Sequence, residues 1–210
     1  MKNVINYLTK NLEFMSEDLQ SEAKHAIEKL QNGTVAMVQV SIRALKNLAR
    51  MCELTVSPVS EFIVEDKFQH RAKKGIKMYF YDNFKNWVYN PMQKKKVSLQ
   101  AQMKLEKFSL TKPMYDTEIQ TELGNSKPIP VAMFFPLILG LLSLQPNGEE
   151  KDGGLLVNGY ANIFHVVLVD NHVVAVRAYW DGDEWDLYSY GLDYGIGWDD
   201  GDCFFAPATA

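Results

Sequence analysis

The chain has 210 residues, of which 47% are hydrophobic, 12% aromatic and 23% charged. This composition excludes an intrinsically disordered chain, and the length allows one large domain or two small ones around a shared core. The formal net charge of -4 conceals an uneven distribution: residues 67–112 are basic, whereas the chain after Arg177 has no Lys or Arg and many Asp, Trp and Tyr residues. This polarity can steer two kinds of partner, or let one half of the molecule complement the other.

Helical spacing dominates the first quarter of the chain. Apolar residues recur at gaps of three and four in residues 5–30 and again in residues 35–52. Between the two runs, Gly33 can end one helix in the left-handed conformation and Thr34 can cap the next. The sequence therefore predicts an antiparallel helical hairpin, followed by a third helix over residues 58–74.

The hydrophobic period changes from helical to alternating after Gly75. Ile76, Met78 and Phe80 alternate with Lys and Tyr residues, and apolar and polar residues alternate strictly over residues 97–106. Because successive side chains of a strand point to opposite faces, a period of two is typical of a half-buried strand. We therefore predict a three-stranded antiparallel meander over residues 76–110 with a basic outer face.

Residues 129–144 form the longest apolar run. It is about four residues shorter than the ~20 that cross a bilayer, and it contains Pro130, Pro136 and Gly140. A buried core helix is therefore the better interpretation, and no membrane association is expected. The first residues show no signal-peptide pattern, because Asn, Thr and Lys interrupt every apolar stretch. These observations predict a cytoplasmic protein.

A second antiparallel meander is expected after a Gly-rich linker at residues 145–154. Its strands, 162–169, 172–180 and 185–190, are separated by Asp170-Asn171 and by an acidic turn. If Asp170 and Asn171 form a two-residue turn, Val169 faces His172 across the hairpin. One face of this meander is then mainly core. The opposite face becomes amphipathic toward its end, where it carries Arg177, Tyr179, Asp186, Tyr188 and Tyr190.

The predicted fold class is α+β: an N-terminal helical hairpin, two antiparallel β-meanders and a buried apolar helix. We expect a helical region at residues 1–75, the basic meander and apolar helix at 76–145, and an acidic, aromatic meander at 155–210. These three parts are expected to share one compact unit.

Catalytic and metal chemistry have weak support in the sequence. A cysteine hydrolase needs a thiol activated by histidine, and His165 and Cys203 are the available pair. Such a nucleophile usually opens a helix, whereas only seven residues follow Cys203, one of them proline. The acidic runs 181–186 and 199–202 do not fit a calcium loop, and the four histidines have no zinc spacing. We therefore expect no catalytic residue, metal or cofactor, and treat the hydrolase as a third hypothesis.

The first hypothesis is a non-enzymatic protein that binds another macromolecule through its acidic, aromatic surface. Tyr and Trp anchor many protein interfaces, and neighbouring carboxylates would steer a basic partner. An inhibitor or immunity-type protein has this character. The partner-binding residues would be the five at the amphipathic end of the second meander, Arg177, Tyr179, Asp186, Tyr188 and Tyr190.

The alternative hypothesis is nucleic-acid binding by the basic segment 67–112. Aromatic rings interleaved with cations are what a single strand requires. The residues expected to carry this activity are Lys77, Lys85, Lys94, Lys95 and Lys96. A solvated strand face with lysines that discourage edge-to-edge aggregation would look the same in sequence, so the pattern alone does not separate these two readings.

Overall fold

The computed structural model describes residues 45–208, apart from 73, 125–126, 152–153 and 196, together with Lys24. The chain divides into two units, residues 1–44 and 45–210, and in the first only Lys24 is described, as an exposed helical residue. The second unit is built on one eight-stranded sheet. Its strands are β1 (Leu48–Val56), β3 (Met78–Phe80), β5 (Met103–Leu110), β7 (Ile129–Pro130), β8 (Asn162–Val167), β9 (Val173–Trp180), β10 (Trp185–Gly191) and β12 (Cys203–Pro207).

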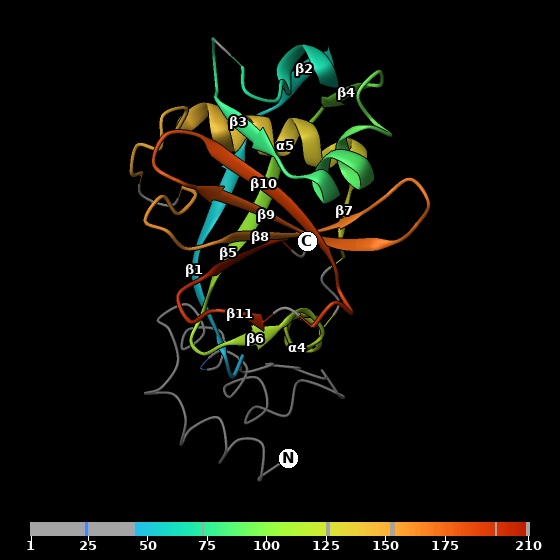
Figure 1. The fold of residues 1–210 in the computed structure, drawn as a ribbon. Helices are drawn as coiled ribbons and strands as arrows, with labels where there is room; N and C mark the ends of the chain where they lie inside the picture. The colour runs from blue at the N-terminus through green and yellow to red at the C-terminus, as the bar shows by residue number, and fades with distance from the viewer. Residues whose placement is uncertain are drawn as a thin grey trace. The chain divides into compact units, whose positions relative to one another are not determined.

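The sheet is mixed and has the strand order β1-β5-β12-β8-β9-β10-β3, with β7 pairing to β8 off this path (Figure 1). The pairs β12–β8, β7–β8 and β10–β3 are parallel, and the others are antiparallel. Smaller elements complete the unit: a β2–β4 ribbon (Val59–Ile63, Lys96–Leu99), a β6–β11 ribbon (Met114–Tyr115, Gly197–Trp198), and the helices α3 (Val64–Lys67), η2 (Phe84–Tyr89), α4 (Asp116–Leu123) and α5 (Val131–Leu144).

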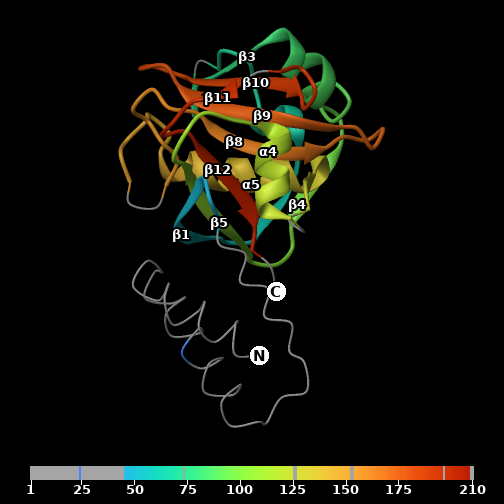
Figure 2. The ribbon, with the colours of Figure 1, turned by 90° about the horizontal axis from the view of Figure 1, so that it is seen from below.

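Two layers flank the sheet and define two hydrophobic clusters. Helix α5 covers one face, where Phe134 and Ile138 are buried in one cluster with Phe164 and Leu187. The β6–β11 ribbon and α4 lie on the other side (Figures 1 and 2). There Ile119, Met114 and Trp198 cluster with side chains of β8, β9 and β12. Among the described residues, the second layer covers only part of its face, and beyond it Tyr79, Tyr81, Tyr179 and Tyr188 are half-buried.

The buried apolar helix expected at residues 129–144 is present as α5, which begins at Val131 because Ile129 and Pro130 form β7. Most side chains of α5 are buried, including Pro136. No helix in the described part of the chain is both long and apolar enough to cross a membrane.

The predicted α+β fold class with an N-terminal helical hairpin is wrong, because the described residues form mostly sheet. Most of the hairpin falls in residues 5–44, outside the described residues, but the end of its second helix lies in strand β1. Ala49 and Cys52 pair there with β5, and a bulge between Arg50 and Cys52 shifts the register. Pairing with a strand about fifty residues away overrides the local helical spacing, because cross-strand packing decides strand formation.

The predicted third helix over residues 58–74 is also incorrect. This segment contains strand β2 and only the single helical turn α3. Phe62 and Ile63 of β2 pair with Val97 and Lys96 of β4. Again the pairing partner is distant in sequence, so the proline at position 58 marks a strand entry rather than a helix start.

The predicted meander over residues 76–110 does not form, although its alternation of buried and exposed side chains is present. Strand β3 pairs with β10, β4 with β2, and β5 with β1 and β12. Residues 84–89 form a π-helix instead of a strand. The alternating run 97–106 is split between β4 and β5, and Gln100 to Gln102 leave the sheet. Alternation identifies a strand but does not indicate its partner.

The second meander is present as β8, β9 and β10, all antiparallel. Its first hairpin differs from the prediction by one residue: Val167 pairs with Val173 and His165 with Ala175. The cause is a three-residue loop, in which the Asn171 N–H donates to the Leu168 carbonyl at 3.1 Å and Asn171 has a left-handed φ of 67°. Asparagine tolerates this conformation, so the loop gains a residue relative to a two-residue turn.

Candidate functional site

The five residues predicted to bind a partner lie on one face of the sheet. In the β9–β10 register, Arg177 pairs with Tyr188, Tyr179 with Asp186, and Ala175 with Tyr190. Directly paired residues point to the same side, so the five side chains share the face opposite Trp185. The one-residue error in the β8–β9 hairpin does not alter this result, because all five residues belong to β9 and β10.

Strand β3 and the residue that follows it add two tyrosines, Tyr79 and Tyr81, that the alternation pattern alone does not assign to this face. Tyr79 pairs with Asp186 in the parallel β10–β3 ladder, and the Tyr81 N–H donates to the Leu187 carbonyl at 3.0 Å. The Tyr81 ring stacks on Tyr188, with centroids 3.6 Å apart and planes at 19°. Alternation of Tyr79 and Tyr81 with buried neighbours was visible in the sequence, but the parallel partner was not.

Tyr79, Tyr81, Tyr188 and Tyr190 form a continuous tyrosine row across β3 and β10. Tyr79 meets Tyr81 edge-on at 4.7 Å, and Tyr188 and Tyr190 are nearly parallel at 6.1 Å. At the far end Tyr190 contacts Trp198 of β11 at 5.9 Å. All four tyrosines are half-buried, so each ring is held by its neighbours while part of it faces solvent.

Arg177 lies against the middle of the tyrosine row. Its guanidinium carbon is 4.5 Å from the centre of the Tyr179 ring and 5.4 Å from that of Tyr188. Its buried Nε finds no hydrogen-bond acceptor among the described residues, and none of their carboxylates forms an ion pair with it. This cation is therefore held by aromatic rings rather than by a countercharge.

Three carboxylates gather where the tyrosine row meets the β9–β10 turn. Oxygens of Asp181, Glu184 and Asp186 lie within 4.8 Å of one another. Asp181 Oδ1 accepts the backbone N–H groups of Asp183 and Glu184, both at 3.1 Å, which shapes the turn. We call Asp181, Glu184 and Asp186 the acidic cluster. No Lys or Arg in the described ranges forms an ion pair with it.

Asp186 is the most buried carboxylate of the acidic cluster, and its pKa is shifted. Its side chain is almost fully enclosed, with 6% of the residue exposed. Burial raises the pKa of the Asp186 carboxyl to about 6, and repulsion from Asp181 and Glu184 adds to the shift, while Tyr81 and Arg177 oppose it. Burial likewise raises the pKa of the Tyr188 phenol. Burial and the two neighbouring carboxylates therefore disfavour the ionised form of Asp186.

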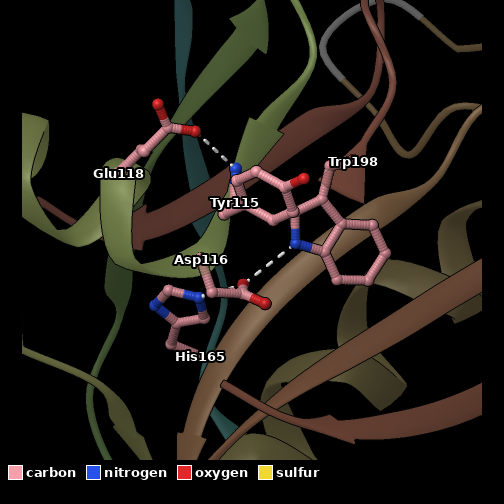
Figure 3. A network of polar contacts seen from close by, with 5 residues as sticks. All are labelled: Tyr115, Asp116, Glu118, His165 and Trp198. Atoms are coloured by element: carbon pink, nitrogen blue, oxygen red, sulfur yellow. Dashed lines mark hydrogen bonds and ion pairs between the residues drawn. The ribbon is translucent and has the colours of Figure 1, made fainter. Parts of the chain in front are cut away.

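The covered end of the same sheet face holds a buried polar network (Figure 3). Asp116 Oδ1 accepts the Trp198 Nε1–H at 2.9 Å and lies 2.7 Å from His165 Nε2. Glu118 Oε2 accepts the Tyr115 N–H at 2.8 Å and so caps the start of α4. Both His165 and Asp116 are buried. The network ties α4 and β11 to β8, which is a structural role.

The proposed thiol-hydrolase pair is not brought together. His165 lies on the face of Ile163 and contacts Phe204, whereas Cys203 pairs with Asn162 and packs in the cluster on the opposite face. Burial raises the pKa of the Cys203 thiol to about 11. A protonated thiol on the far side of the sheet from the histidine cannot act as its nucleophile.

We expect Cys203 to be inert toward thiol reagents in the folded chain, because it is buried and protonated at neutral pH. Of the two cysteines, only the half-buried Cys52 should react before denaturation. Mass spectrometry after brief labelling measures the stoichiometry. Rapid modification of the folded protein that disappears in Cys203→Ser would contradict this expectation.

The five lysines of the nucleic-acid hypothesis lie around β3, η2 and β4. Lys94 pairs with Glu65 at 2.6 Å, and Lys96 with Glu61 at 2.8 Å. Lys77 precedes β3, Lys85 lies on η2, and Lys95 is exposed between the two ion pairs. Part of this basic charge is therefore already balanced within the molecule.

Comparison with known proteins assigns no family to this chain, because no family model, curated protein or solved structure matches it.

Proposed function

We propose that this chain is a non-enzymatic binding protein that captures another protein through the tyrosine row. The observation that carries the proposal is the sheet face itself. Four half-buried tyrosines, each in ring contact with the next, lie beside the Arg177 guanidinium and three carboxylates, and these charged groups have no ion-pair partner in the described ranges. A face with this composition is suited to contact with a partner. Without a partner it leaves apolar ring area exposed to water, which is unfavourable.

The stacking favours tight association for a physical reason. Tyrosine contributes a large apolar area and a hydroxyl, and it loses few rotameric states on binding. Here Tyr81 and Tyr188 are already fixed against each other, so much of the ordering cost is incurred in the folded protein rather than on association. Charged groups at the rim of such a patch steer the encounter.

The proposal includes an inhibitor or immunity-type role and a cytoplasmic location. An inhibitor needs no chemistry of its own, only a rigid face complementary to its target. Cys52 and Cys203 are free thiols, which is compatible with a reducing compartment.

Nucleic-acid binding has weaker support than protein binding. Lys94 and Lys96 already have carboxylate partners, and the acidic cluster beside the tyrosine row would repel phosphates. We therefore keep it as an alternative outcome of the capture experiment.

We expect the double variant Tyr188→Ala with Asp186→Ala to lose the protein that the wild-type chain captures from its native host. Tyr194→Ala, which removes a tyrosine that is 73% exposed and lies outside the row, is the matched control. Quantitative affinity capture measures both. The proposal requires a protein retained by wild type and control but reduced at least about tenfold with the double variant, roughly 1.4 kcal/mol. Equal retention by all three, or retention of nucleic acid alone, would refute it.

A further inference from the structure

We infer that His70 is a pH-sensitive latch, which keeps the outer edge of β3 closed while its imidazole is neutral and releases that edge in acid. Strand β3 is the last strand of the sheet and has β10 on its inner side (Figure 1). The latch is a conformational device of the fold, and it does not depend on the proposed function. It is carried by the way in which His70 and Arg71 cover the edge of β3.

The outer edge of β3 is covered, among the described residues, by a very short segment at His70 and Arg71. The edge of a sheet presents backbone N–H and C=O groups that need partners. Here the Arg71 N–H donates to the Met78 carbonyl at 2.7 Å, and His70 forms an isolated parallel bridge with Met78. Arg71 then adopts a left-handed φ of 54°, so the segment leaves the strand direction after this one bridge. The ladder of backbone hydrogen bonds therefore ends at Met78.

The His70 side chain takes the next backbone donor along this edge. Its Nδ1 accepts the Phe80 N–H at 2.9 Å, in the place where a neighbouring strand would offer a carbonyl. The imidazole also contacts two rings of β3, with its centre 4.8 Å from that of Tyr79 and 5.7 Å from that of Phe80. These contacts position the imidazole over the edge, although the residue as a whole is exposed.

The hydrogen bond from Phe80 requires one protonation state of His70. A backbone N–H can only donate, so Nδ1 must carry a lone pair, and the proton of the neutral ring lies on Nε2. Protonation of the imidazole adds an N–H at Nδ1, which then faces the Phe80 N–H donor to donor. The protonated ring therefore loses its bond to the edge.

The charges around His70 set the pH at which the edge is released. Burial lowers the pKa of His70 below its ordinary value of about 6.5, and the cations Arg71 and Lys85 of η2 add to the shift. Glu184 of the β9–β10 turn opposes this shift in pKa. Because the folded state has the lower pKa, the stabilisation from the latch is complete above about pH 6.5 and is lost as the pH falls through the folded value.

Amide hydrogen exchange of the full chain tests the latch. It is read by NMR at the Phe80 N–H from pH 7.5 to pH 5 and corrected for the pH dependence of exchange in an unfolded peptide. We expect the protection of this amide to fall by about tenfold as His70 titrates, which is the size expected for one lost hydrogen bond. Amides of the central strand β9 are the internal reference. Long-range ¹H–¹⁵N spectra of the His70 ring should show its proton on Nε2 at pH 7.5.

Two substitutions separate the latch from a general sensitivity to acid. His70→Asn retains a side-chain acceptor without a titratable group, so the Phe80 N–H should stay protected at both pH values. His70→Ala removes the acceptor, so protection should be about tenfold lower at pH 7.5 and independent of pH. His172→Asn is the matched control, because His172 is exposed and pairs with Asp170 of the β8–β9 loop. It should leave the exchange profile of Phe80 as in the wild type.

Three outcomes would overturn the inference. A proton on Nδ1 at pH 7.5 would show that the ring does not accept the Phe80 N–H. Protection in His70→Ala equal to that in the wild type would show that the side chain does not close the edge. A pH dependence that persists in His70→Asn would assign the response to another group, such as Asp186, whose pKa is raised to about 6. None of these measurements requires a captured partner, so the proposed function is tested separately.

Discussion

Trp185→Ala is expected to lower the free energy of unfolding by about 3–5 kcal/mol. Trp185 begins β10 and points to the α5 side of the sheet, where it is fully buried. Its ring packs against Trp180 at 5.4 Å, and its Nε1–H donates to the Gln145 carbonyl at 3.1 Å. Truncation removes a large apolar area and leaves a cavity. The Gln145 carbonyl also loses one of its two donors and keeps the Gly148 N–H at 3.1 Å, so the losses accumulate.

Chemical denaturation of the full chain measures this loss, and Tyr188→Ala is the informative control. Tyr188 occupies the opposite face of the same strand and is half-buried, so its removal should cost only on the order of 1–2 kcal/mol. If one face of β10 is structural and the other binds a partner, Trp185→Ala should cost more stability than Tyr188→Ala. If Tyr188→Ala unfolds the protein as readily as Trp185→Ala does, the tyrosine row is packing and the proposed function loses its location.

The parts of the fold that sequence reasoning found are those whose contacts are local. Helix α5 follows from one uninterrupted apolar segment, and β8, β9 and β10 follow from alternation separated by acidic turns. Even there, the register depended on Asn171, whose left-handed conformation added one residue to the loop. A period identifies faces, whereas loop geometry sets which residues pair.

The parts of the fold that sequence reasoning missed depend on pairing between segments that are distant in the chain. The segment that forms β1 has helical spacing, but it pairs as a strand with β5 at the edge of the sheet. β3, β4 and β5 alternate as a meander would, yet each pairs with a strand elsewhere in the chain. Nothing local indicates that Met78 pairs with Trp185 across more than a hundred residues. Non-local strand pairing is the information that a single sequence conceals.

The candidate site shows the same division. Alternation along β9 and β10 correctly grouped Arg177, Tyr188 and their neighbours on one face, because both strands belong to the local meander. Tyr79 and Tyr81 reach that face only through the parallel β10–β3 ladder. The row therefore combines residues predicted from sequence with residues that only the topology supplies, and its continuity depends on both.

Asp116→Ala should destabilise the chain by about 3–5 kcal/mol, because it removes one member of a buried polar network and leaves the others enclosed. His165 Nε2 and the Trp198 Nε1–H would both lose their acceptor, and each buried group left unpaired costs about 1–3 kcal/mol. Asp116→Asn retains a side-chain oxygen and should cost less. Glu118→Ala, which removes only the contact to the exposed Tyr115, serves as the control.

Amide hydrogen exchange distinguishes the expected mechanism from general unfolding. The network joins α4 and β11 to β8, so Asp116→Ala should first increase exchange in α4, β6 and β11, while β9 and β10 stay protected. Because these two strands carry most of the tyrosine row, the row should stay folded in the variant under folding conditions. Unchanged stability would show that the network contributes no net energy, and loss of protection in β10 before α4 would show that the two ends of the sheet face are not independent.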